Sequence, residues 1–122
     1  MLQSVEEVSI PLVAWTLADL RRVPHLPGAF FLKPERVQEE LTALPGWRGV
    51  ANYRGIDQVR RFPTAEVASA FAGFVSTFAQ EAGQLCLVVQ NAEHVTVTLT
   101  GRHPGGAFGV TRAVLDFVNR LA

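Results

Sequence analysis

The chain has 122 residues, of which 48% are hydrophobic and 18% are charged, and its eleven basic and eleven acidic side chains cancel. This composition excludes an intrinsically disordered chain, and the zero net charge argues against a nucleic-acid partner. The apolar stretches are also far shorter than the roughly 18 to 20 residues that a membrane helix requires, so we expect no membrane contact. A chain of this length needs only one hydrophobic core.

The single cysteine, Cys86, excludes an internal disulfide framework and favours the reducing cytoplasm. Glu6 and Glu7 stand where a signal peptide would be basic, and Pro11 interrupts the short apolar run at the start of the chain. These features predict a cytoplasmic protein.

Residues 1–33 form an N-terminal extension in our interpretation. Val8, Ile10 and Leu12 alternate with polar or breaking residues, which predicts an extended edge segment. Thr16 and Asp19 resemble a short capping box, which predicts a helical turn after it. This extension could lie across an open face of the sheet or dock a partner.

A first helix is predicted after the extension, because Pro34 is harmless in a first turn and apolar residues then recur at helical spacing, namely Val37, Leu41 and Leu44. Pro45 and Gly46 should end it. Two strands over residues 47–53 and 56–62 follow, joined at Arg54 and Gly55.

The second helix is the clearest element of the sequence. Thr64 can cap its N-terminus and Gly83 can close its C-terminus. Five residues between them draw one apolar stripe that we expect to face the core: Val67, Phe71, Phe74, Val75 and Phe78.

A third strand is predicted over residues 85–89, an uninterrupted apolar run, and a fourth over residues 94–100, in which apolar and polar residues alternate. A strand that is apolar on both faces must be covered on both faces. Helices on one side cover only one face, so the second cover should come from residues 1–33 or from a second subunit. A glycine-rich loop, Gly101 to Gly109, then leads into a final amphipathic helix.

This order of elements predicts an α+β two-layer sandwich: a four-stranded antiparallel sheet with helices on one face, in the sequence α-β-β-α-β-β-α. The sandwich should span residues 34–122, preceded by the extension over residues 1–33.

Few side chains form a pattern that suggests chemistry. Cys86 lies inside an apolar run, where a cysteine behaves as a small hydrophobe. Three scattered histidines and one cysteine show no metal-ligand spacing, so we expect neither a metal nor a cofactor. The glycine-rich loop lacks the dinucleotide and P-loop spacings; with Arg102 and His103 it holds an anion or is a plain connection.

Four arginines close together admit two interpretations, a nucleic-acid patch or solvated residues at the edge of the sheet, and we favour the second: Arg48, Arg54, Arg60 and Arg61.

Core and turn residues carry a family resemblance: Gly46, Trp47, Val50, Ile56, Phe62, Ala68, Phe71, Val75, Ala79, Val95, Val97, Leu99, Thr100, Gly105 and Gly106. With these residues, the chain over about residues 34–122 resembles the pterin-4a-carbinolamine dehydratase family. The resemblance supports a shared fold more strongly than a shared activity.

The resemblance also implies where a reaction would occur. Enzymes of that family remove water from a 4a-hydroxytetrahydropterin with histidines as general acid and base. Their His-His-Pro run falls on Gln84, Leu85 and Cys86 here, and neither the amide nor the leucine can exchange a proton. The other family positions hold Gln80, Ala92, Arg102 and, after a two-residue insertion near Ala107 and Phe108, Val114.

Three hypotheses for function remain open. The first is a non-catalytic binding or assembly module, a homodimer with a possible protein partner; the resemblance offers a dimerisation cofactor of a transcription factor and a RuBisCO assembly factor as precedents. The second is a divergent dehydratase whose acid/base site is rebuilt from His103, His94 and Arg102. The third is a module that binds a pterin-like small molecule without chemistry. His25 we interpret as a solvated residue of the extension.

Overall fold

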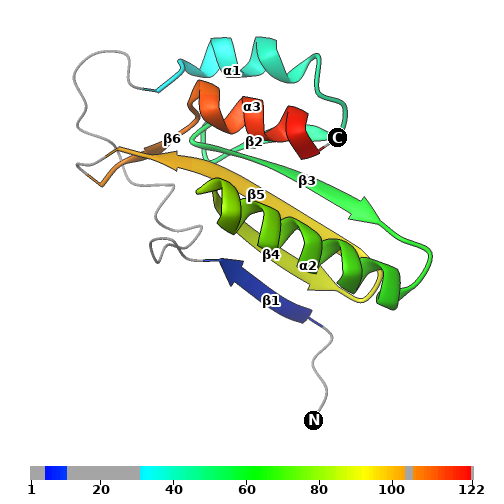
Figure 1. Ribbon diagram of the computed structural model, residues 1–122. Coiled ribbons are helices and arrows are strands. Elements are labelled where there is room, and N and C mark those ends of the chain that lie inside the picture. Colours follow the sequence, from blue (N-terminus) through cyan, green and yellow to red (C-terminus); the bar gives the residue numbers. More distant parts are fainter. Residues whose placement is uncertain (1–4, 11–30, 104–105, 122) are drawn as a thin grey trace.

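The computed structural model describes residues 5–10, 31–103 and 106–121. Figure 1 shows a twisted sheet with helices packed on it. The helices are α1 (Pro34–Leu41), α2 (Ala65–Ala82) and α3 (Arg112–Leu121). The strands are β1 (Val5–Ile10), β2 (Trp47–Val50), β3 (Gly55–Arg61), β4 (Leu85–Asn91), β5 (His94–Arg102) and β6 (Phe108–Gly109). The expected helix at Thr16 and Asp19, and the position of His25, lie outside the described residues.

The main sheet is antiparallel, with strand order β1-β4-β5-β3-β2, and β6 pairs with β5 beside that path. The extended edge segment predicted in the extension is confirmed, because β1 pairs with β4 and places Val8 opposite Val88. The four-stranded sheet expected from the sequence is therefore enlarged by β1 at its edge and by the short β6.

One face of the sheet carries the main core. Ile56, Cys86 and Leu99 lie opposite one another across β3, β4 and β5, so they share a face. All three helices bury side chains in the same cluster, including Val37 of α1, Val75 of α2 and Val114 of α3. The predicted α+β two-layer sandwich is confirmed.

The core face of α2 is not the stripe that the sequence predicted. Val75 is buried as expected, but Val67 and Phe74 are 45% and 56% exposed. The residues that face the sheet with Val75 are small: Ala68, Ala72, Ser76 and Ala79. Small side chains let a helix approach a sheet closely, which leaves the larger residues on the flank and outer side.

The predicted ends of α2 are correct. The Thr64 hydroxyl accepts a hydrogen bond from the Val67 amide at 3.2 Å, and Gly83 closes the helix in the left-handed conformation with φ 71°. The predicted strand over residues 47–53, however, is too long. It stops at Val50 because the next three residues, Ala51 to Tyr53, all have positive φ.

The second face of β4 is covered within the chain. Leu85 and Leu87 are buried in a separate apolar cluster with Phe108, against which Val50 and Ala51 pack. Phe108 belongs to β6, which lies within the segment expected to be an irregular glycine-rich loop. Because Phe108 pairs with Arg102, part of this loop forms a short strand antiparallel to the end of β5.

Candidate functional site

Gln84 stands at the junction of α2, β4 and β5. Its backbone amide donates to the Ala79 carbonyl as part of the helix C-cap. Its buried side-chain amide donates at 2.9 Å to the Leu85 carbonyl and at 2.8 Å to the Thr100 carbonyl. Both amide hydrogens of Nε2 are therefore used to hold the start of β4 to the end of β5.

The next two positions are apolar in character. Leu85 is 7% exposed and packs with Phe108 on the face of the sheet opposite the three described helices. Cys86 is fully buried in the main core. Burial raises the pKa of the Cys86 thiol to about 12, because a thiolate would lose its hydration there, and this removes its nucleophilicity near neutral pH.

The remaining positions of the expected site are dispersed. Gln80 is exposed on α2, and Val114 is buried under α3 in the main core. Arg102 is exposed at the end of β5, with its guanidinium 5.7 Å from the centre of the Phe108 ring. No face of the described structure collects these three side chains around one point.

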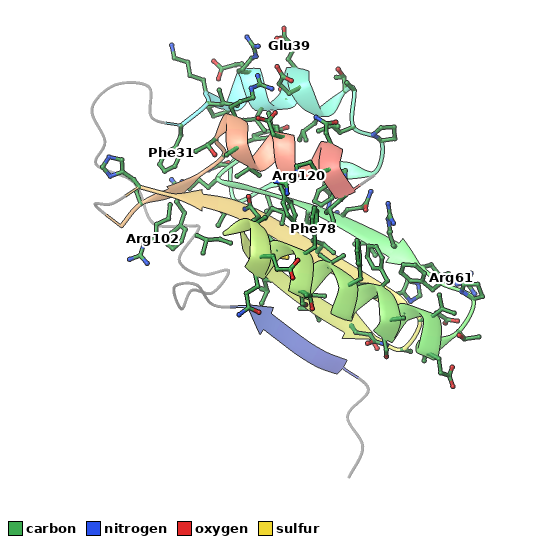
Figure 2. The ribbon with its side chains drawn as sticks, viewed as in Figure 1. Phe31, Glu39, Arg61, Phe78, Arg102 and Arg120 are labelled. Carbon is green, nitrogen blue, oxygen red and sulfur yellow. The ribbon has the colours of Figure 1, made fainter. Side chains whose placement is uncertain are left out.

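The structure does not bring the candidate histidines together. His94 begins β5 and His103 follows its last residue, so the two are nine positions apart along an extended strand, about 30 Å at the usual rise of a strand. Figure 2 shows the same separation, since Arg61, which pairs with His94, lies at the opposite end of the sheet from Arg102. An acid/base pair of these two histidines within one chain is geometrically excluded.

His103 and Arg102 are neighbours at one end of the sheet. The backbone of His103 forms a tight turn, in which its amide donates to the Ala107 carbonyl and its carbonyl accepts from the Gly106 amide. A hollow of about 280 Å³ lies near this end, with walls that include Phe31, Tyr53, Arg54 and Phe108. Neither Arg102 nor His103 is among its described lining residues.

The clustered arginines divide between the two faces of the sheet. Arg60 lies over the Phe71 ring on the helix side, whereas Arg48 pairs with Asp57 at 2.7 Å on the other side. Arg61 lies 4.0 Å from Glu93. These contacts support the interpretation as residues at the edge of the sheet.

Within the described residues, no group of three or more His, Cys, Asp or Glu side chains could hold a metal ion. In the same part of the chain, no helix combines the length and apolar character needed to cross a bilayer.

Sequence reasoning missed the importance of Phe108 and Thr100. Phe108 appeared only as part of an insertion, yet it packs against Leu85, and the Arg102 guanidinium lies over its ring. Thr100 is fully buried, and its hydroxyl donates to the Arg54 carbonyl at 2.8 Å, which ties β5 to the turn before β3. A large aromatic residue within an otherwise glycine-rich segment was the available signal for Phe108.

Comparison with known proteins relates the chain to solved structures, of which one is described below. No protein-family model and no curated protein sequence matches the chain. The crystal structure of a transcriptional coactivator/pterin dehydratase from Brucella melitensis does match, with a TM-score of 0.63 and 23% identity, over 75% of this chain and 94% of that one. The chain therefore has the fold of a pterin dehydratase/transcriptional coactivator.

Proposed function

We propose that this chain is a non-catalytic binding or assembly module built on the pterin-dehydratase-like fold, working as a homo-oligomer in the cytoplasm without a cofactor. The observation that carries the proposal is the use of positions 84–86, where the family resemblance expects the acid and base. The side-chain amide of Gln84 donates to two backbone carbonyls, and Leu85 lies in an apolar cluster.

The chemistry of these side chains supports a loss of the dehydration reaction. General acid and base catalysis needs a group that exchanges protons near the working pH. An amide and a leucine cannot do so, and the buried Cys86 thiol, with a pKa of about 12, stays protonated. Restoring an imidazole at position 84 would also break the two hydrogen bonds that join β4 to β5.

The proposal is tested by offering the purified chain a 4a-hydroxytetrahydropterin and following its dehydration spectroscopically against the rate without protein. We expect no acceleration. Calorimetric titration with a reduced and an oxidised pterin belongs to the same experiment. Binding without turnover would favour the third hypothesis, a pterin-like ligand held without chemistry, and no binding would favour a protein partner or a second copy.

A divergent dehydratase is the second candidate, and one observation favours it: His103 lies beside Arg102 at the end of β5, and Arg102 is one of the positions that the family resemblance assigns to the site. The chain offers a matched control, because His94 is a histidine at the far end of the same strand. Turnover that is lost in His103→Ala and kept in His94→Ala would establish this candidate and overturn the non-catalytic module.

A further inference from the structure

The second half of β3 reverses the usual arrangement of apolar and polar residues on a sheet. Gln58 and Arg60 are two and four positions after the buried Ile56, so they share the face on which the helices pack. Val59 lies on the other face and is 51% exposed. Polar side chains on a covered face cost free energy unless they find partners. A local departure of this kind is expected at a functional site.

Gln58 and Arg60 line a hollow of about 120 Å³. It lies where the C-terminal end of α3 meets β2, β3 and α2 (Figure 1). The apolar part of its wall includes Trp47, Phe71 and Leu121. Arg60 is the only charged side chain among the described residues that line it. The hollow therefore combines an apolar, partly aromatic wall with a single positive charge.

Arg60 is held in place but keeps most of its hydrogen-bonding capacity. Its guanidinium lies over the Phe71 ring, 4.9 Å from the ring centre. Its Nε donates at 2.8 Å to Gln58 Oε1, and the Gln58 amide donates in turn to the Pro45 carbonyl at 3.4 Å. Within the described part of the chain, the two terminal nitrogen atoms have no acceptor and no carboxylate pairs with this arginine. Arg60 is thus an oriented cation whose fork is open to a ligand.

Asn119 supplies a second donor in the wall of the hollow. One N–H of its side-chain amide donates to the Leu115 carbonyl at 3.3 Å, and the other has no acceptor among the described residues. A carboxylate accepts hydrogen bonds from amide and guanidinium groups, and its two oxygen atoms match the fork of an arginine. No acidic residue is among the described lining residues, so the wall itself does not repel an anion.

We propose that this hollow binds a small free carboxylic acid with an apolar body, in its ionised form. The carboxylate pairs with the terminal nitrogen atoms of Arg60 and accepts from Asn119, while the apolar body lies against Trp47 and Leu121. Positions 84–86 do not line the hollow, so this binding site is separate from the site described above and goes beyond the proposed function.

Size and charge together define the class of ligand. A cavity of about 150 Å³ accommodates benzene, so a hollow of about 120 Å³ suits most of a phenyl ring or a short branched aliphatic group. A neutral ligand would leave the Arg60 guanidinium without a counterion. An inorganic anion would leave the aromatic wall uncovered. A monocarboxylate with one apolar group satisfies both parts of the wall.

Phenylacetate is the probe, and binding to the full chain is followed by NMR titration at pH 7. The indole N–H of Trp47 and the side-chain amide of Asn119 report on the hollow. Phenylacetamide provides the same ring without the charge, and acetate provides the charge without the ring. Arg60→Gln removes the cation. Its matched control is Arg61→Gln, because Arg61 is the next residue of β3, lies on the opposite face, and is exposed with Glu93 at 4.0 Å.

We expect saturable shifts of the Trp47 and Asn119 signals, with a dissociation constant for phenylacetate of about 1 mM or lower. Phenylacetamide and acetate should bind roughly 10-fold more weakly or worse, and so should phenylacetate to Arg60→Gln, because charge-assisted hydrogen bonds are lost. Arg61→Gln should bind phenylacetate as the wild type does. Circular dichroism verifies that both variants are folded.

Three results would overturn the inference: no saturable shift with phenylacetate, shifts that leave the Trp47 and Asn119 signals unchanged, or phenylacetamide binding as tightly as phenylacetate. An equal loss of affinity in both arginine variants would also contradict it. The comparison of the three probes uses the wild type alone, so it holds even if a variant does not fold. None of these results depends on whether the chain dehydrates a pterin, so the proposed function stands or fails separately.

Discussion

Replacing Gln84 by alanine tests whether this position now serves the architecture of the sheet. The substitution removes two hydrogen bonds, of 2.9 and 2.8 Å, from a side chain that is 8% exposed. Each bond contributes about 1 kcal/mol net, so we expect a loss of about 2 kcal/mol. With an unfolding entropy of about 2.1 cal/mol/K per residue over 122 residues, this corresponds to a melting temperature lower by about 8 °C.

The assay is urea unfolding followed by circular dichroism, with thermal unfolding as a second measurement. The matched control is Gln80→Ala, which truncates the same residue type at an exposed position of α2. The control should stay within about 0.5 kcal/mol of the wild type, as surface substitutions usually do. A Gln84→Ala variant as stable as the control would refute the argument that the amide holds β4 to β5.

Three further predictions concern buried and paired groups. Leu85→His should destabilise the fold by about 2 to 4 kcal/mol. The loss should be larger below about pH 6.5, because a buried imidazole has a lowered pKa and the unfolded chain then binds more protons. Urea midpoints at pH 5 and pH 8 check this. Cys86 should resist a thiol reagent in the native state and react in urea, and stability should fall above pH 9, where the unfolded thiol ionises and the native one, with a pKa of about 12, does not. Rapid native labelling would contradict its burial. Hydrogen bonds from Arg112 and Arg36 lower the pKa of Glu40 from 4.5 to about 2, so the stability they provide is complete above pH 4.5 and is lost as the pH falls towards 2; Glu40→Gln should abolish that dependence.

The sequence predicted the elements of the fold better than the orientation of α2. Capping residues such as Thr64 and Gly83 act locally, so the ends of the helix could be located without knowing its surroundings. Which side faces the sheet depends on how closely the two layers pack. Hydrophobicity favoured the phenylalanines, whereas the sheet accepts the alanines, and no local signal distinguishes these outcomes.

The strand limits show the same division between local and distant causes. The edge strand β1 follows from its alternating residues, but its partner β4 is about 80 residues away in the sequence. The early end of β2 depends on a left-handed turn of Ala51, Asn52 and Tyr53, and alanine and tyrosine give no warning of positive φ.

The sequence predicted which catalytic groups are missing from the candidate site better than it predicted what the side chains there do instead. The residue types at 84–86 were sufficient to question the reaction, because proton exchange is a property of the side chain itself. The separation of His94 from His103 required only the length of β5. The use of the Gln84 amide and the cover that Phe108 gives Leu85 depend on tertiary contacts, so sequence reasoning could not supply them.

The central claim is that the fold is kept while the proton-transferring groups are gone. Dehydration of a 4a-hydroxytetrahydropterin tests it most directly. The rate is measured at a high concentration of the wild-type chain and compared with the uncatalysed rate in buffer. The account predicts a rate equal to that of buffer between pH 6 and 9. A rate that rises in proportion to protein concentration, and falls when His103 alone is replaced, would contradict it.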